Sequence, residues 1–304
     1  MIATARDYLH LHFLVFIWGF TAVLGLLISI PAVEIVFYRT FFASIALFFL
    51  LWWRKRNFQI GTGEIIKIFA TGFLIAGHWI LFFGSARVSN VSVCLAGIAT
   101  CSFWTSLAEP LMNRQKIKIF EVILGLVVIV GLYIIFRFEF NHALGLAMAV
   151  VSAILSAIFT VLNGKFTQKH NPYMITFYEM AGACVIIILF FPLYTGYLAE
   201  SGTLQLLPTW TDIFYLLILA LICTVYTYSA SVELMKKVTA FAMNLTVNLE
   251  PVYGILLAII VFGEKEHMQP EFYVGTFTIL LSVLCYPLIN KLQRRKAMKV
   301  DNIR

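Results

Sequence analysis

Residues 239–263, TAFAMNLTVNLEPVYGILLAIIVFG, are apolar enough to cross a bilayer, yet they hold two amides, a carboxylate and a proline. A membrane-spanning helix needs about 20 predominantly apolar residues. A charged side chain at the centre of such a helix costs roughly 2.5–3.5 kcal/mol on insertion scales, so these residues normally face a bundle interior or a water-filled cavity. We therefore expect Glu250 to point inward, away from lipid.

The rest of the chain is similarly apolar. Of its 304 residues, 61% are hydrophobic and 12% are charged, and its mean hydropathy is +0.92. Soluble domains carry about a quarter charged residues, so the composition predicts an all-α integral membrane protein. Ten apolar runs with short connections predict ten transmembrane helices, at about 11–30, 33–52, 64–84, 90–112, 118–136, 143–163, 173–194, 211–234, 239–263 and 270–290.

Lysine and arginine are distributed unevenly between the two sets of connections. If the N-terminus is cytoplasmic, 18 of the 22 basic residues fall in cytoplasmic segments, Arg39 lies within a span, and Arg87, Arg137 and Lys265 lie outside. This bias predicts a multi-pass protein of the cell (inner or plasma) membrane with cytoplasmic N- and C-termini. The apolar composition implies contact with the lipid bilayer. Because the basic residues are spread over many loops and form no compact basic domain, we expect no nucleic-acid partner.

The two halves of the chain can be aligned with each other. The matching stretches are FTAVLGL (20–26) with FTVLNGK (159–165), FYR (37–39) with FYE (177–179), and ARVSNVSVCL (86–95) with KKVTAFAMNL (236–245). Each half holds five predicted spans, an odd number, so the second half must enter the membrane from the opposite side. We predict two inverted five-helix repeats, 1–138 and 139–291, and a basic cytoplasmic tail at 292–304. Such repeats are typical of secondary transporters, which bind substrate between the halves.

Several motifs resemble the EamA family of the drug/metabolite transporter superfamily. They are Trp18-Gly19, Pro31 to Arg39, SNVSV at 89–93, LEPVYGILLAIIVFGE at 249–264, and Gly275. The resemblance covers nearly the whole chain. It implies ten helices, a central cavity formed by the first four helices of each half, peripheral fifth and tenth helices, and export or uptake of small metabolites, amino acids included.

Two positions need care in this comparison. Many members of the family carry a lysine near the end of the first span, where this chain has Leu26; Lys165 stands at the equivalent place in the second half. Glu109-Pro110 looks like Glu250-Pro251, but an ungapped alignment of the halves sets Thr100-Cys101 opposite the latter. We expect Glu109 near the cytoplasmic end of its helix.

The polar residues of 239–263 are the first candidates for a substrate site. On a helix, Tyr253 shares a face with Glu250, whereas Asn244 and Asn248 are stacked on a different face. Pro251 has no amide hydrogen and kinks the helix, which frees a carbonyl. Glu250 either handles substrate or protons, or is bonded permanently to a neighbouring helix; the sequence leaves both readings open.

Arg39 and Glu179 occupy equivalent positions in the two repeats and carry opposite charges. One reading is that each guards one mouth of the cavity and changes partners as the halves rock. The other is that each pairs permanently with a nearby polar group or, for Arg39, reaches the lipid headgroups. Tyr38 and Tyr178 stand beside them in sequence and are candidate cavity residues.

His78 is the histidine expected deep within the hydrocarbon region. Its ordinary pKa lies near neutrality, so it is a candidate for proton handling, although a lone histidine also serves as an interhelical hydrogen-bonding group. Trp18 completes the set of candidate cavity residues.

The leading hypothesis is a secondary transporter that moves a small metabolite, an amino acid or related compound, by alternating access, with export as the expected direction. Proton coupling, uncoupled facilitation and exchange all remain open. We expect no catalytic residue, cofactor or metal site, because no GxxxxGK[ST], HExxH or CxxC motif occurs. The alternatives are a nucleotide-sugar exchanger of the same superfamily and a membrane-embedded lipid-group transferase. The expected partner is a small-molecule substrate, and a homodimer is left open.

Overall fold

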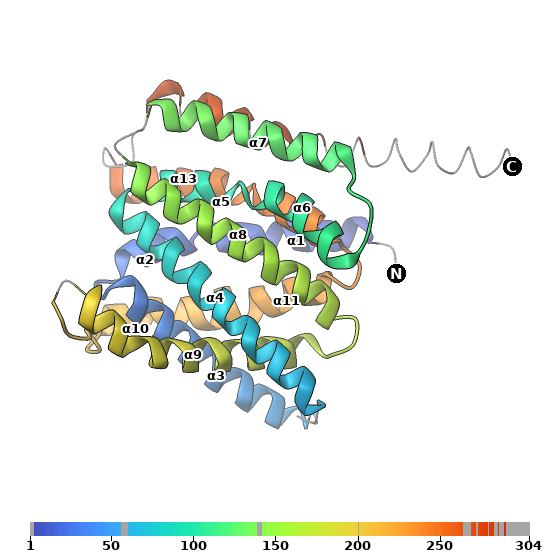
Figure 1. Cartoon of the computed structure of the whole chain (residues 1–304). Coiled ribbons are helices and arrows are strands. Elements are labelled where there is room, and N and C mark those ends of the chain that lie inside the picture. The colour runs from blue at the N-terminus through green and yellow to red at the C-terminus, as the bar shows by residue number, and fades with distance from the viewer. Residues whose placement is uncertain are drawn as a thin grey trace, which may run out of the picture.

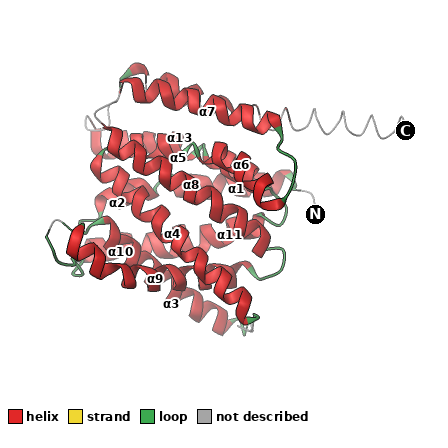
Figure 2. Ribbon diagram, in the orientation of Figure 1, coloured by secondary structure: helices red, strands yellow, loops and turns green. Residues whose placement is uncertain are grey.

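The protein is a helical bundle in the computed structural model. The structure describes residues 3–55, 60–138, 142–199, 201–263, 269–271, 273–278, 280–282, 285 and 289. Within these ranges there is no strand, and the helices are joined by short loops (Figure 2). Eight helical stretches are long and apolar enough to cross a membrane. The predicted all-α membrane fold is confirmed.

Four of these stretches lie in the first half of the chain. They are Ala5–Leu27, made of α1 (Ala5–Trp18) and α2 (Thr21–Leu27); α3 (Ala32–Trp53); α4 (Thr62–Val88); and Val91–Asn113, made of α5 (Val91–Ile98) and α6 (Cys101–Asn113).

The other four lie in the second half. They are α8 (Ala143–Phe166); α9 (Pro172–Tyr197); Trp210–Leu234, made of α10 (Trp210–Leu217), the π-helix η2 (Ile218–Tyr226) and α11 (Thr227–Leu234); and Ala240–Phe262, made of α12 (Ala240–Val247) and α13 (Glu250–Phe262).

The predicted fifth and tenth spans are less complete. The fifth coincides with α7 (Ile119–Phe138), which lies at the edge of the bundle (Figure 1). The tenth falls only partly within the described residues, where an apolar helix runs over Tyr273–Ser282. The number of ten helices therefore stays a prediction, and the basic tail at 292–304 lies outside the described residues.

Two hydrogen bonds of α4 establish the relative direction of the halves. Arg87, near the end of α4, donates to the carbonyl of Ile28, just beyond α2, at 2.7 Å. Ser85, half a turn earlier, donates to the carbonyl of Gly145, near the start of α8, at 2.7 Å. The first span of the first half thus ends on the side where the first span of the second half begins. The two spans run in opposite directions (Figure 1), as inverted repeats require.

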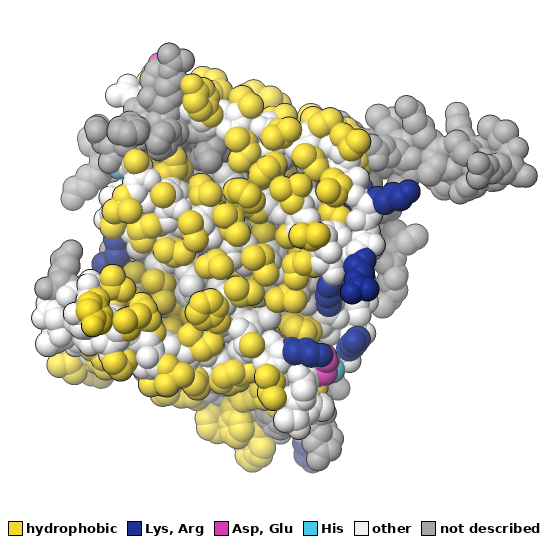
Figure 3. Space-filling model, viewed as in Figure 1, with side chains coloured by type: hydrophobic (Ala, Val, Ile, Leu, Met, Phe, Trp, Pro, Cys, Tyr) yellow, Lys and Arg dark blue, Asp and Glu magenta, His cyan; other side chains and the backbone are white. Residues whose placement is uncertain are grey.

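We call the side on which α1 begins the N-terminal face and the side on which α2 ends the opposite face. Trp53, 80% exposed, ends α3 at the N-terminal face, and Trp210, 87% exposed, begins α10 at the opposite face. Tryptophan is enriched at both membrane–water interfaces. In Figure 3 the surface between the two edges is mostly hydrophobic, and lysine and arginine gather mainly at the edge that carries the N-terminus.

Two glycines bring α4 and α9 into close contact at the centre of the bundle. A Cβ atom added at Gly72 would lie 2.6 Å from the carbonyl carbon of Gly182 and 2.8 Å from the carbonyl oxygen of Glu179. Small residues allow membrane helices to approach in this way. The crossing sets Glu179 directly against α4.

Candidate functional site

In the part of the chain that the structure describes, three spans are broken near the middle. The breaks fall at Gly19-Phe20, at Ala99-Thr100 and at Asn248-Leu249. At each break a backbone amide bonds three residues back instead of four, for example Phe20 to Ile17 at 3.2 Å. Irregular backbone at membrane depth is tolerated where it is buried in protein or lines a cavity. The breaks therefore indicate where a cavity lies.

Two of the breaks are equivalent in the two halves. Helices α5 and α12 have eight residues each and begin after the capping residues Asn90 and Thr239. In each half the next helix starts three residues later, at Cys101 and at Glu250. The structure therefore sets Cys101 opposite Glu250. Our ungapped alignment placed Thr100 there, one residue away, because it matched Ser89 rather than Asn90 with Thr239.

The three breaks meet at one chamber of about 80 Å³. Residues on both sides of each break line it: Trp18 and Thr21, Ile98 and Cys101, Val247 and Glu250. The wall extends towards the N-terminal face along Ser231, Met235 and Met243. Pockets for drug-sized ligands have about 300–1,000 Å³, so the chamber fits only a small molecule unless the helices separate.

Arg39 projects from α3 into this chamber and is only 2% exposed. Its Nε donates to Thr224 Oγ1 at 2.8 Å, and its guanidinium carbon lies 3.8 Å from the centroid of the Trp79 ring. Among the described residues, no carboxylate lies within 4.0 Å of the guanidinium. An unpaired buried cation is costly, so Arg39 is suited to receive an anionic group.

Glu250 lines the chamber from α13 and is 6% exposed. It accepts a long hydrogen bond of 3.4 Å from the hydroxyl of Thr21. Thr21 also donates to the carbonyl of Trp18 at 2.7 Å, so its one proton is shared. Over the described ranges Glu250 has no basic partner within 4.0 Å. The carboxylate is therefore free to receive a cationic group.

Three further predicted residues line the chamber but are held by neighbouring helices. Asn244 donates to Thr105 at 2.8 Å, and Trp18 donates to the carbonyl of Cys223 at 3.1 Å. His78 Nδ1 lies 3.0 Å from the carbonyl oxygen of Ser152. These contacts fix the orientation of the chamber walls.

Tyr38 and Tyr178 do not line the chamber. The hydroxyl of Tyr38 donates to the carbonyl of Leu206 at 2.9 Å, and the ring of Tyr178 packs on that of Phe177 with centroids 5.1 Å apart. Successive residues on an α-helix do not share a face. Each tyrosine therefore points away from its charged neighbour.

Asn248 and Tyr253 also lie outside the lining. The side-chain amide of Asn248 is within hydrogen-bond distance, 2.9 Å, of the hydroxyl of Ser102, which joins the two equivalent breaks. Tyr253 packs edge-on against Phe16, with ring centroids 5.3 Å apart. Both residues connect helices instead of facing the chamber.

Glu179 is fully buried behind the chamber wall. Its carboxylate accepts hydrogen bonds from Thr71 at 3.0 Å and from Tyr228 at 3.1 Å. Asn163 lies at 3.5 Å. Glu179 and Arg39 are thus held by different sets of neutral partners, and the described residues place no ion pair between them.

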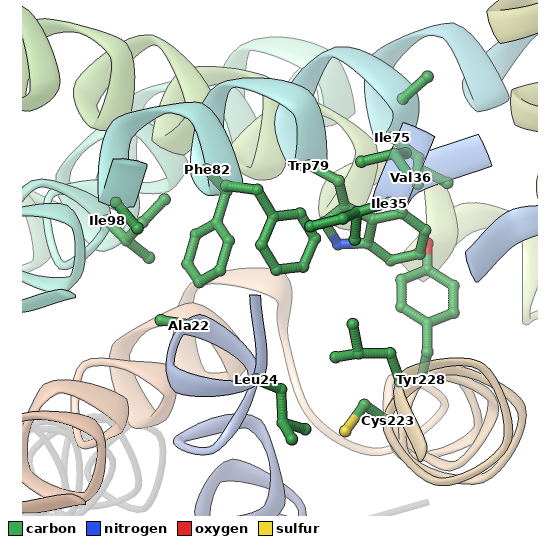
Figure 4. Close-up of a cluster of buried hydrophobic side chains, with 14 of the residues drawn as sticks. Ala22, Leu24, Ile35, Val36, Ile75, Trp79, Phe82, Ile98, Cys223 and Tyr228 are labelled. Atoms are coloured by element: carbon green, nitrogen blue, oxygen red, sulfur yellow. The ribbon is translucent and has the colours of Figure 1, made fainter. Parts of the chain in front are cut away.

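Trp79 and Tyr228 form an aromatic wall of the chamber. They face each other from α4 and α11 (Figure 4), with ring centroids 6.2 Å apart in an edge-to-face arrangement. Trp79 is the ring on which Arg39 stacks. Its position beside His78 in sequence was the one available signal.

The two halves are joined at the opposite face by the carboxylate of Asp212. It accepts from the amide and from the hydroxyl of Ser29, both at 2.7 Å. Nearby, Glu34 accepts from the amide of Gln205 at 3.1 Å. These bonds hold the end of the first span against the second half.

The N-terminal face carries its own connections between the halves. Lys237 pairs with Asp7 at 2.8 Å. Glu109, near the end of α6, accepts from the amide of Phe241 at 2.7 Å and so caps α12. Glu109 lies near the end of its helix on the face that carries the N-terminus.

A bundle of membrane-spanning helices whose halves begin in opposite directions, with broken helices around a chamber that holds two charged side chains, is typical of membrane transporters. Comparison with known proteins agrees. An uncharacterized transporter from Haemophilus influenzae is 21% identical over 287 residues, 87% of this chain and 88% of that protein. A solved crystal structure superposes with a TM-score of 0.70 at 11% identity, covering 94% of this chain and 99% of that one, which shows the same fold. The sequence model of the EamA-like transporter family matches residues 8–137 and again 143–286, so the chain belongs to this family.

Proposed function

We propose that the protein is a secondary transporter that exports a small zwitterionic metabolite, an amino acid or related compound, by alternating access. The observation that carries the proposal is the presence of one guanidinium and one carboxylate in a single small chamber. Arg39 suits the carboxylate of such a molecule and Glu250 suits its ammonium group. Charge-assisted hydrogen bonds of this kind are the strong ones.

The walls of the chamber support a substrate with an apolar side chain. Trp79, Phe82 and Phe159 line it together with Met243. Ligand sites are usually lined by aromatic and apolar groups with a few polar groups that fix orientation. A zwitterion would bind its charged end between Arg39 and Glu250 and its side chain against these rings.

Two features support export as the direction of transport. The chamber wall extends to the N-terminal face, and the basic residues of that side indicate the cytoplasm. We infer that the protein lies in the cell membrane with both termini in the cytoplasm, and that substrate enters from there. A proton bound at Glu250 in place of the substrate ammonium would couple this export to the proton gradient.

A nucleotide-sugar exchanger is the second candidate, but the chamber does not favour it. Two phosphates need several cations, and Arg39 is the one lysine or arginine in the chamber lining. The small volume also opposes a nucleotide sugar.

The test is counterflow in proteoliposomes. Vesicles are loaded with unlabelled amino acids, monoamines, monocarboxylates or nucleotide sugars, one at a time, and uptake of a labelled amino acid mixture is followed. We expect internal zwitterions to accelerate uptake of the labelled amino acids, and internal monoamines or monocarboxylates not to accelerate it. Arg39→Gln should abolish counterflow and Glu250→Gln should reduce its rate, whereas the exposed-site controls Arg54→Gln and Glu233→Gln should leave it unchanged. Acceleration by nucleotide sugars and not by amino acids would overturn the proposal.

Coupling is tested in the same vesicles with an imposed pH gradient. We expect the gradient to drive amino acid accumulation in the wild type. In Glu250→Gln the gradient should have no effect, although exchange of an unlabelled for a labelled substrate could be retained at a reduced rate. Identical responses of the two proteins to the gradient would contradict the coupling role.

A further inference from the structure

A second recess lies on the N-terminal face between α4 and α8. It has a volume of about 500 Å³ and is lined in part by Glu64, Lys67, Lys165 and Lys169. Thr71 belongs to the same lining but is only 4% exposed. The recess therefore runs from a charged rim down to one buried hydroxyl.

That hydroxyl contacts a fully buried acid. Thr71 Oγ1 lies 3.0 Å from Glu179 Oε1 and 2.5 Å from the carbonyl oxygen of Ile68, so its one proton is shared between these two acceptors, and Glu179 has no exposed surface. The Gly72–Gly182 contact holds the two helices together at this level. Thr71 is thus the single side chain between the recess and the carboxyl group.

On its other side the acid contacts the chamber wall. Tyr228 lines the chamber, and its hydroxyl donates to Glu179 Oε2 at 3.1 Å. The same hydroxyl oxygen accepts a hydrogen bond of 2.7 Å from Asn163. Glu179 is therefore one side chain away from each of two separate cavities.

We propose that Thr71, Glu179 and Tyr228 form a proton path between the N-terminal face and the substrate chamber, with Glu179 as its protonation site. The link to transport rests on the proposed function, whereas the protonation site itself does not.

The path moves one proton by ordinary acid–base steps. A hydronium ion in the recess gives a proton to Thr71 and becomes water, as the threonine hydroxyl passes its own proton to the ionised Glu179, which becomes a carboxylic acid. After the carboxyl group rotates, the acid passes the proton to the oxygen of Tyr228 as that hydroxyl releases its own to water in the chamber. Each transfer breaks one O–H bond and forms one, and no net charge stays on the hydroxyls.

Protonation also changes the chamber wall. The ionised carboxylate accepts the proton of Tyr228, so that the hydroxyl points away from the chamber. A carboxylic acid can instead donate to Tyr228, whose oxygen then accepts two hydrogen bonds and whose hydrogen turns towards the chamber. Substrate in the chamber would sense this change, and linkage makes the effect reciprocal.

Of the described side chains that contact the carboxyl group of Glu179, Tyr228 is the one that can itself titrate. Helix α4 presents Thr71 and α8 presents Asn163, both neutral, and α11 presents the titratable Tyr228. Helix α3, also packed on α9, carries Arg39, which lines the chamber and binds Thr224 instead.

The protonation site is tested without substrate by infrared difference spectroscopy of the full-length protein in lipid, titrated over about pH 4 to 9, a span that covers ordinary and buried carboxyl groups. We expect several protonated-carboxyl components that titrate in the wild type, one of which is lost in Glu179→Gln and retained in Glu250→Gln. If Glu179→Gln does not fold, Glu179→Asp should shift this component. A set of components unchanged by both Glu179 variants overturns the proposal.

The two flanking hydroxyls are tested by exchange and by transport. In Thr71→Val we expect the Glu179 band to remain but to exchange with deuterated water at least severalfold more slowly. In Tyr228→Phe the band should remain while the pH dependence of amino acid counterflow is lost. A wild-type rate of deuterium exchange in Thr71→Val together with a wild-type pH dependence of counterflow in Tyr228→Phe would overturn the proposed path. A titrating Glu179 band in a protein that moves no substrate would instead overturn the proposed function alone.

Discussion

Arg39 and Glu250 line one chamber from opposite halves of the chain and form no ion pair with each other. Arg39 is held by Thr224 and by the face of Trp79. Glu250 is held by a long hydrogen bond from Thr21. Two opposite charges kept apart in this way can each bind one end of a zwitterion, and each end can be tested separately.

Replacing Arg39 by lysine should reduce transport at least about tenfold, even though the positive charge is kept. A lysine has no planar group to stack on Trp79 and cannot bind a carboxylate with two parallel hydrogen bonds. Initial rates of counterflow check this, with Arg54→Lys as the matched exposed control. A variant with wild-type rates would show that Arg39 does not bind substrate.

Replacing Trp79 by leucine should raise the substrate concentration needed for half-maximal transport. A cation–π contact of a desolvated arginine contributes about 2 kcal/mol, and its loss lets the guanidinium move away from its position in the chamber. The control is Trp53→Leu, because Trp53 is 80% exposed and lies outside the chamber. Equal saturation curves for the two variants would contradict this role of Trp79.

Adding one methyl group at Gly72 should lower thermal stability. The new Cβ would lie 2.6 Å from the backbone of Gly182, and overpacking of this kind costs about 1–3 kcal/mol. At Gly164 an added Cβ meets no atom within 4 Å, so Gly164→Ala should be neutral or stabilising by up to about 1 kcal/mol. Thermal unfolding in detergent compares the two. Equal midpoints would contradict the close crossing of α4 and α9.

Removing the carboxylate of Asp212 should open the opposite face. The carboxylate of Asp212 accepts hydrogen bonds from the backbone amide and the side-chain hydroxyl of Ser29. Asp212 also caps α10 together with Thr209. Ser29→Ala removes the hydroxyl hydrogen bond to Asp212 and leaves the cap of α10 intact. It therefore separates the bond between the halves from the capping of α10. We expect both variants to increase labelling of a cysteine introduced in the chamber wall by reagents added at the opposite face, Asp212→Asn more than Ser29→Ala. No increase in either variant would show that these bonds do not close the face.

The fold was largely predictable because membrane insertion leaves a strong signal in sequence. Runs of apolar residues must be long enough to cross the bilayer, so composition and length identify the helices. The internal match between 20–26 and 159–165 indicated the repeat, and the opposed directions of the first spans agree with it. The breaks were harder to predict. Pro251 marked one of them, but the Gly19-Phe20 and Ala99-Thr100 breaks contain no proline and depend on tertiary packing.

The candidate site was predictable only in part. The rule that buried charges avoid lipid predicted that Glu250 points inward, and Glu250 is buried. For Arg39 the sequence left open that it reaches the lipid headgroups, and the structure buries it against Trp79. Tyr38 and Tyr178 were chosen for their sequence neighbours, and the helical repeat turns them to another face. Thr71 and Thr21 carried no signal, because single hydroxyls are common in membrane helices and their role depends on what lies opposite.

Transport as proposed requires one chamber between oppositely directed halves to open to each side of the membrane in turn. A chain with its five native cysteines replaced and Ser156→Cys introduced in the chamber wall tests it directly. Membrane-impermeant thiol reagents are applied to sealed vesicles of each orientation, with and without amino acid substrate. We expect the Ser156→Cys protein to be labelled from both sides and to be protected by substrate on both. Labelling from one side alone under all conditions would contradict it.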